Sequence, residues 1–232
     1  MSKFLIALGA MLALMPLPAL AQEIVVTGSR IRGGDSPAQT AGIGIRRRAD
    51  FAVQRVTVYG DAREKEARRK EILDTVRAAI QLGDKRGVQL SYGDAIIQPL
   101  TLANFADKLT FEKDDNRDDS EQVTFIVKTP LTDGNALAAI DRLAAFIKAV
   151  PAVGRAVVAA DGDPGVSIVD PSQYRQQIIA AIAADANAAA RQFGPDYAVE
   201  VDNLATPVRW VLASPTEVLL YIGHDLKVMP KR

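Results

Sequence analysis

The sequence predicts an α+β fold with two layers, in which helices pack on one face of a mostly antiparallel sheet. Short runs rich in β-branched and aromatic residues recur along the chain, and each ends at turn-forming residues. Three longer segments between these runs repeat apolar residues at helical spacing. The chain has 232 residues, of which 48% are hydrophobic, which suffices for one core or at most two small ones.

The predicted domain begins with a strand and a helix. Residues 51 to 59 (FAVQRVTVY) favour a strand, which Gly60 ends. Asp61 is a good N-cap for a helix over residues 62 to 82, and Gly83 is a typical helix stop. The outer face of this helix alternates basic and acidic residues, which indicates contact with solvent rather than a binding patch.

Two short strands and an acidic segment are predicted next. Residues 88 to 92 and 95 to 100 favour strands around a Gly-Asp turn. Residues 112 to 121 carry six acidic side chains, and we predict a mobile acidic loop there. The alternative is a calcium site. However, the run DDNRDD lacks the glycine and the closing glutamate of an EF-hand loop.

The second half of the domain repeats the alternation of strands and helices. Residues 122 to 129 alternate as a strand does, and residues 134 to 149 carry a helical apolar stripe that stops before Pro151. Asp170 and Pro171 predict the start of a third helix, which ends at Gly194. Further strands are predicted over residues 156 to 160 and 166 to 169, joined by a DGDPG turn, and over 197 to 201, 208 to 213 and 217 to 222.

Residues 1 to 21 are predicted to be a cleaved signal peptide. Lys3 precedes an apolar run over residues 4 to 15, and Ala19-Leu20-Ala21 fits the small-x-small cleavage pattern. The run is shorter than the about 20 residues that span a bilayer. A retained N-terminal anchor is the alternative. We expect a periplasmic protein, free or associated with the outer membrane, with no transmembrane span in the mature chain.

The residues after the predicted cleavage site form the most specific motif of the chain. From residue 23 they read EIVVTGSRI, and the run of isoleucine, valine and threonine strongly favours an extended conformation. The segment resembles the TonB box of TonB-dependent outer-membrane receptors, which pairs edge-to-edge with a strand of TonB. The alternative is a β-prone tail with no partner. The resemblance implies that a TonB-like protein binds, by strand addition, the residues Glu23, Ile24, Val25, Val26, Thr27, Gly28, Ser29, Arg30 and Ile31.

The sequence divides the mature chain into a tail, a domain and a short C-terminal extension. Residues 22 to 48 are predicted to be the TonB-box-like tail and a flexible linker, because glycine, serine and proline punctuate residues 32 to 44. The domain covers residues 49 to 225, and residues 226 to 232 are a C-terminal tail. Arg46-Arg47-Arg48 closes the linker, either as a solvated cluster or as a contact for lipid phosphate or an acidic partner.

The domain itself resembles the SIMPL-domain family of secreted bacterial proteins over roughly residues 49 to 222. The likeness lies in the order of the elements: the first strand and charged helix, the strand over 122 to 129 with its helix, the alanine-rich third helix, and the closing VRW and EVLLYI segments. The resemblance implies an α/β fold, an envelope location and oligomers in some members, without established catalytic residues. A homo-oligomer is therefore a further expectation, whereas the long tail departs from the family.

The composition excludes several classes of function. Twenty-eight basic and 28 acidic residues argue against a nucleic-acid binder, and the absence of cysteine excludes a thiolate nucleophile and a Cys-based metal site. We expect no cofactor and no metal. A secreted hydrolase would have to rely on Asp161, Asp163 and His224, but aspartates in such a turn typically bind backbone donors and a lone terminal histidine is typically solvated.

The sequence therefore favours a non-enzymatic envelope protein. Its N-terminal extended segment would bind TonB or a related energy-transducing partner, and its α/β domain would mediate protein contacts. Two alternatives remain open at this point. One is a structural, SIMPL-type envelope protein with a vestigial tail, and the other is a secreted hydrolase.

Overall fold

The computed structural model describes residues 23–27, 43–94, 96–114, 117–132 and 135–231. The predicted α+β fold is confirmed, since helices pack against sheets in which every strand pairing among these residues is antiparallel. The predicted signal peptide lies outside the described residues. No helix of the described part is long and apolar enough to cross a membrane.

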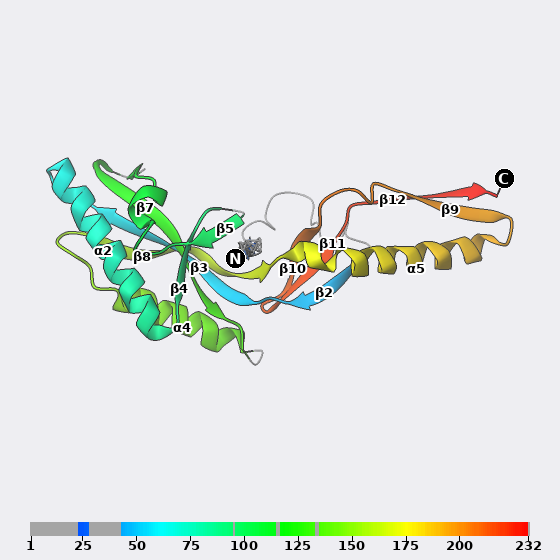
Figure 1. The fold of residues 1–232 in the computed structure, drawn as a ribbon, viewed down its shortest axis with the longest axis horizontal. Helices are drawn as coiled ribbons and strands as arrows, with labels where there is room; N and C mark the ends of the chain where they lie inside the picture. The colour runs from blue at the N-terminus through cyan, green and yellow to red at the C-terminus, as the bar shows by residue number, and fades with distance from the viewer. Residues whose placement is uncertain (1–22, 28–42, 95, 115–116, 133–134, 232) are drawn as a thin grey trace, which may run out of the picture.

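Six strands close into a ring at one end of the molecule (Figure 1). Their spatial order is β3-β8-β1-β5-β4-β7, and β3 also pairs with β7, which closes the ring. A short strand, β6 (Glu112–Asp114), pairs with β7 outside the ring. The six strands are β1 (Glu23–Thr27), β3 (Phe51–Gly60), β4 (Gln89–Tyr92), β5 (Ile96–Pro99), β7 (Arg117–Pro130) and β8 (Val157–Val169).

The outer face of the ring carries the main core. Helices α2 (Lys65–Arg86) and α4 (Ala136–Ala149) pack on it, and the short helix α3 (Phe105–Lys108) adds Phe105. Successive residues of a strand point to opposite faces. Every second residue of β3 and β7 therefore points outward, and the apolar side chains among these residues join the main core. Phe125 and Phe146 are each only 1% exposed there. The main hydrophobic stabilisation therefore comes from the helix-covered face.

The helix boundaries differ from the sequence prediction for local reasons. Helix α2 begins at Lys65 rather than residue 62, because Asp61 binds the Arg155 guanidinium instead of capping the helix. It continues past Gly83 to Gly87, whose φ of 67° favours glycine. In α4 the Asn135 side chain accepts a hydrogen bond from the backbone N–H of Ala138.

Gly83 lies inside α2, where it allows a close approach of β4. A Cβ at this position would come within 2.5 Å of the Val88 carbonyl oxygen and 2.8 Å of Leu90 Cδ1. Alanine normally stabilises a helix interior relative to glycine, but here we expect Gly83→Ala to lower the free energy of unfolding by about 2 kcal/mol through this clash. Urea unfolding followed by circular dichroism measures it. The control is Gly87→Ala, where only the left-handed backbone opposes the change, at about 1 kcal/mol.

The predicted DGDPG turn is instead part of one long strand, so the prediction of two strands joined by a turn was wrong. Strand β8 runs through Asp161 and Gly165, and its register against β3 shifts between Val53 and Arg55. Gln54 stabilises this bulge, because its Nε2 donates to the carbonyl oxygens of Asp161 and Gly162 at 3.0 Å each. A bulge needs the same permissive residues as a turn, which explains the misleading signal.

The acidic segment also differs from the prediction of a mobile loop. Residues 112–114 form β6, and β7 begins at Arg117, well before the predicted start at Gln122. The two strands pair as an antiparallel hairpin, in which Glu112 lies opposite Gln122 and Lys113 opposite Glu121. Glu121, which the sequence placed in the loop, is buried and accepts hydrogen bonds from two arginines of α2. Residues 115 and 116 lie outside the described part.

A second, three-stranded sheet follows the ring. It consists of β10 (Arg209–Ser214), β11 (Glu217–Tyr221) and β2 (Gly44–Arg48), in the order β10-β11-β2. The prediction of a flexible linker up to residue 48 was therefore wrong for its last five residues, because β11 supplies a partner strand that the local sequence does not reveal.

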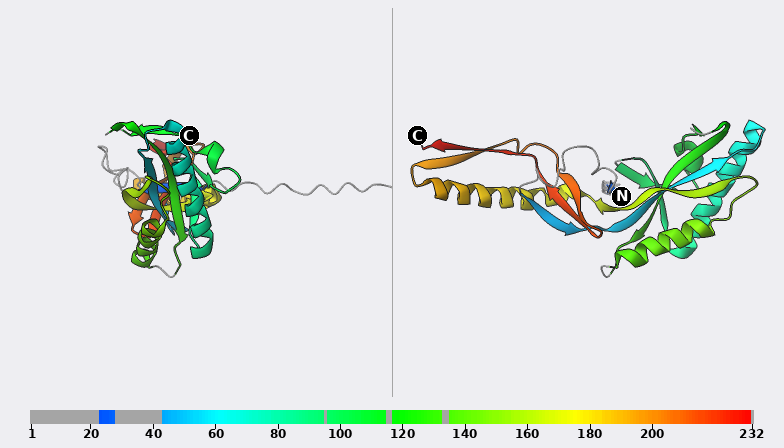
Figure 2. Two further views of the ribbon diagram at one scale, coloured as in Figure 1. Left: turned by 90° about the vertical axis from the view of Figure 1, so that its left-hand side faces the viewer. Right: turned by 180° about the vertical axis from the view of Figure 1, so that it is seen from behind.

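An arm extends from this sheet along the long axis of the molecule (Figures 1 and 2). The chain enters it through a 3-10 turn, Pro171–Tyr174, and α5 (Arg175–Phe193), whereas Asp170 makes no side-chain cap bond. Helix α5 then packs along β9 (Tyr197–Asp202), which pairs with β12 (Asp225–Pro230) in a two-stranded ribbon. The predicted C-terminal tail is thus mostly a strand of the arm.

Candidate partner-binding site

The TonB-box-like segment is a strand of the ring in this structure. All five residues of β1 pair with β8, from Glu23 opposite Val169 to Thr27 opposite Gly165. On its other edge, Glu23 pairs with Ile97 and Ile24 with Ile96 of β5. The sequence correctly predicts an extended segment here, but it predicts a free tail. The remaining residues of the motif, Gly28 to Ile31, lie outside the described part.

Glu23 anchors β1 through two donors inside the ring. Its carboxylate pairs with the Lys128 ammonium, and it accepts a hydrogen bond from Ser167 Oγ at 2.6 Å. Lys128 Nζ also lies 4.4 Å from the centroid of the Phe51 ring. Glu23 and Lys128 are each 7% exposed, so both charges are largely removed from water. A buried ion pair of this kind is favourable only when further hydrogen bonds complete it, and Ser167 supplies one.

The inner face of the ring is a small and partly polar core. Directly opposite residues of paired strands share a face, and the registers place Glu23 opposite Ile97, Ser167 opposite Phe51 and Ser91 opposite Ile126. Ser91 Oγ has no hydrogen-bond partner among the described residues. Among the described side chains, the buried apolar members of this inner cluster are Val53, Ile97 and Ile126, with Phe51 packed beside them.

The arginine triplet does not form one continuous patch. Arg47 bonds the Gln177 side chain and lies 5.1 Å from the centroid of the Tyr174 ring, so it fastens β2 to the start of α5. Arg46 and Arg48 alternate with it along β2 and are exposed. One of the three arginines therefore has a structural role that the sequence pattern alone does not indicate.

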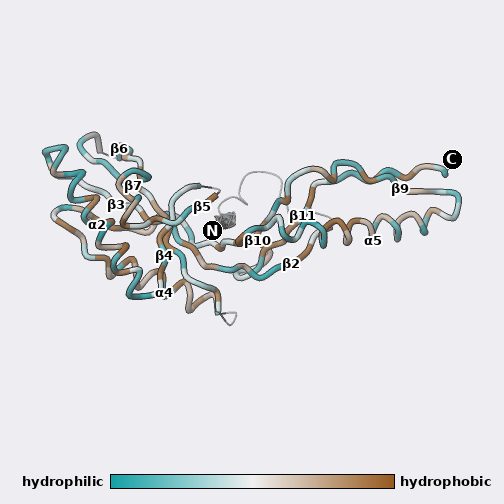
Figure 3. The backbone as a smooth tube through the Cα atoms, viewed as in Figure 1, coloured by the Kyte–Doolittle hydropathy of each residue, from teal (hydrophilic) through white to brown (hydrophobic). Residues whose placement is uncertain are grey.

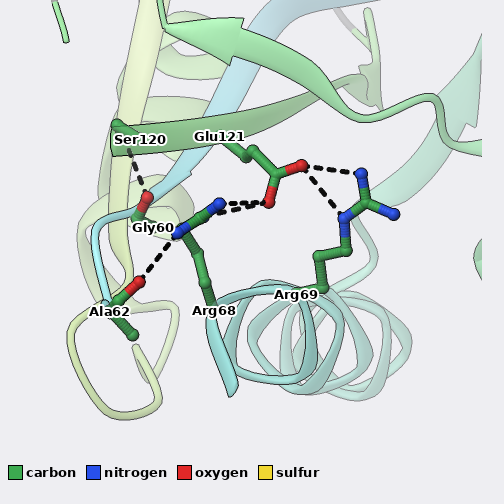
Figure 4. Close-up of polar contacts among 6 residues, drawn as sticks. All are labelled: Gly60, Ala62, Arg68, Arg69, Ser120 and Glu121. Carbon is green, nitrogen blue, oxygen red and sulfur yellow. Dashed lines mark hydrogen bonds and ion pairs between the residues drawn. The ribbon is translucent and has the colours of Figure 1, made fainter. Parts of the chain in front are cut away.

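A second charged cluster fastens α2 to β7 (Figure 4). Glu121 accepts hydrogen bonds from Arg68 Nε at 2.9 Å and from Arg69 Nε and Nη2 at 3.0 and 2.6 Å. The Arg69 hydrogen bond is the main cause that lowers the pKa of Glu121, with Arg68 contributing in the same direction against the effect of burial. Arg68 Nη1 also donates to the Ala62 carbonyl oxygen. With every charged group paired, this cluster is suited to holding the fold together rather than to catalysis.

The residues considered for a hydrolase do not form a catalytic arrangement. Asp161 and Asp163 are exposed within β8. At the β-bulge between β8 and β3, Gln54 Nε2 donates to the carbonyl oxygen of Asp161 and not to its carboxylate. His224 Nδ1 lies 2.8 Å from the Ile222 carbonyl oxygen, so the ring is held by its own chain and is partly buried rather than solvated. Within the described residues, no group of three or more histidine and carboxylate side chains could hold a metal ion.

The sequence does not indicate the residues that receive β1. Lys128, Ser167 and Phe51 come from three different strands, and they converge only because β3, β7 and β8 are neighbours in the ring. The sequence gives no clear signal for Lys128, because it lies on the polar set of positions that alternates with Val123, Phe125 and Val127. Only the structure shows that this charge points inward, where it requires a partner.

Comparisons with protein-family models, with curated proteins and with solved structures find no match for this chain. The resemblances to the TonB box and to the SIMPL-domain family therefore rest on the sequence patterns described above.

Proposed function

We propose that this protein is a non-enzymatic protein of the bacterial envelope, exported to the periplasm, whose segment Glu23–Ile31 binds a TonB-like partner by strand addition. The observation that carries the proposal is that Glu23–Thr27 already forms a strand through main-chain pairing with β8 and β5. Strand addition uses the same main-chain hydrogen bonds between molecules. The folded domain would make further protein contacts.

We expect a peptide of residues 22 to 31 to bind a TonB C-terminal domain with a dissociation constant of about 10 µM, or roughly −7 kcal/mol. Calorimetric titration measures this directly. The matched control is the same peptide with Val26→Pro, which removes one main-chain donor and should abolish binding. Equal affinities of the two peptides, or no binding of either, would contradict the proposal.

A structural role through self-association is the second candidate, and the arm favours it. All six residues of β12 are exposed, and Ala186 is the last buried residue of α5. A two-stranded ribbon by itself is marginally stable, and in the described arm α5 packs against it through β9. Figure 3 shows hydrophobic stretches along this arm. Its exposed large apolar side chains are Phe193, Tyr197, Leu226, Val228 and Met229.

If the arm mediates self-association, the variant with both Leu226→Lys and Val228→Lys should be monomeric where the wild-type chain is oligomeric. Opposed lysines would repel one another across such an interface, and the lost apolar burial is about 2 kcal/mol for each side chain. Sedimentation velocity from 1 to 100 µM measures the oligomeric state. Asp107→Lys, an exposed change on α3, is the control. A wild-type chain that stays monomeric over this range would exclude the candidate.

A further inference from the structure

We propose that the gap between β8 and β5 is a strand-acceptor site, selective for an extended segment that carries a carboxylate. The chain's own Glu23–Thr27 occupies this acceptor site in the structure. The segment could then either dock in the acceptor site or bind a TonB-like partner, but not both at once. The exclusion rests on the proposed function, whereas the acceptor site itself rests on the contacts of β1 alone.

Mutual exclusion follows from the edges of β1. A strand has two edges, and at Glu23 and Ile24 both are paired, one with β8 and the other with β5. A partner strand that adds to the start of the segment must therefore displace at least one of these neighbours. At Val25 to Thr27 the edge toward β8 is paired as well. The segment cannot present its full length to a partner while it is docked.

Selectivity for a carboxylate follows from the base of the acceptor site. Lys128 is 7% exposed, and its ammonium contacts the Phe51 ring and the Glu23 carboxylate. The hydroxyl of Ser167, which is fully buried, donates to the other oxygen of the same carboxylate. An occupant with an amide or an apolar side chain at this position would leave a buried ammonium without its counter-ion. That costs far more than the loss of an exposed ion pair.

The other strand pairings of the ring do not involve β1, so the segment can leave without opening them, which allows docking to be reversible. Among the described residues, the inner cluster has three buried apolar side chains, whereas the main core contains most of the others. The segment is tethered to β2 through residues 28 to 42, so its release leaves the three-stranded sheet paired. Closing a loop of this length costs chain entropy, which opposes docking.

Hydrogen exchange on the mature chain, residues 22 to 232, tests the acceptor site without any partner. We expect slow exchange at the main-chain amides of residues 24 to 27, and exchange at least tenfold faster in Glu23→Gln and in Lys128→Met. The control is Glu217→Gln, a partly buried carboxylate on β11. Exchange of β10 and β11 serves as an internal check that each variant is folded. An unprotected segment in the wild-type chain, or protection that neither variant changes, would overturn the proposal.

Binding in trans tests selectivity directly. The mature Glu23→Lys chain should expel its own segment by repulsion from Lys128. A fluorescent peptide of residues 22 to 31 should then bind this chain, as measured by anisotropy, and at least tenfold more weakly if the peptide carries Glu23→Gln. The chain with both Glu23→Lys and Lys128→Met should lose this preference. Equal binding of the two peptides to the Glu23→Lys chain would overturn selectivity for a carboxylate.

Titration with a TonB C-terminal domain separates failure of the exclusion from failure of the proposed function. We expect the free peptide to bind at least tenfold more tightly than the mature wild-type chain, and Lys128→Met to recover most of that difference. Equal affinities of peptide and wild-type chain would overturn the exclusion while leaving the proposed function intact. If the peptide does not bind TonB but exchange shows docking, the proposed function fails and the acceptor site stands.

Discussion

Replacing Glu121 with glutamine is expected to lower the free energy of unfolding by about 3 kcal/mol. Glu121 is 8% exposed and is the shared acceptor for two guanidinium groups (Figure 4). Without the negative charge, Arg68 and Arg69 repel each other, and Arg68, whose side chain is 11% exposed, cannot reach water without leaving its bond to Ala62. Chemical denaturation followed by circular dichroism measures the loss.

The matched control for this variant is Glu112→Gln, an exposed carboxylate on the neighbouring strand β6. We expect it to change the free energy of unfolding by less than about 0.5 kcal/mol. A loss at Glu121 no larger than that at Glu112 would show that the arginine cluster contributes little to the fold.

The ion pairs of Glu121 with Arg68 and Arg69 should also make the free energy of unfolding depend on pH at acidic pH. The folded-state pKa of Glu121 lies below its ordinary value, chiefly because Arg69 donates to it, so the folded state binds this proton less readily than the unfolded state. Its contribution is therefore fully present above the unfolded pKa of about 4.3 and is lost as pH falls through the folded pKa. The pKa of Asp74 is lowered in the same way, mainly by Lys70. In Glu121→Gln the slope of stability against pH below about 5 should be smaller than in the wild-type chain.

Reversing the charge of Lys128 is expected to have a large effect on the N-terminal strand. Lys128→Glu faces Glu23 with a second carboxylate inside the ring, so we expect β1 to leave the acceptor site and its amides to exchange as in an unstructured peptide. The free energy of unfolding should fall by about 2 kcal/mol. The loss is limited because the tethered strand β1 can leave for water, whereas Glu121 is held within β7 under helix α2.

The compensating variant, with Glu23→Lys and Lys128→Glu together, provides the control for this reversal. It keeps both charges of the pair with their places exchanged, so we expect amide protection of residues 24 to 27 to return in large part. Hydrogen exchange measures both variants in parallel. If the double variant is no better protected than Lys128→Glu alone, the ion pair is not what holds β1 in the ring.

Local sequence correctly predicted the elements whose signals lie within one short segment. The strand over residues 51 to 59 and the helix over 134 to 149 carry their own periodicity, and Gly194 ends the third helix as predicted. The strand nature of residues 23 to 27 follows from their β-branched side chains. Their position was not predictable, because pairing with β8 and β5 depends on residues more than 70 positions away.

The sequence by itself therefore determined the fold class, the extended character of the N-terminal segment and the absence of cysteine chemistry. The tertiary structure decided where charges and strand edges are satisfied. In the folded chain Glu23 pairs with Lys128, and Glu121 pairs with two arginines. Residues 44–48 and 225–230 become strands because β11 and β9 pair with them. The physical reason is that periodicity and capping act over a few residues, whereas strand pairing and the burial of a charge require a partner that only the folded chain brings within reach.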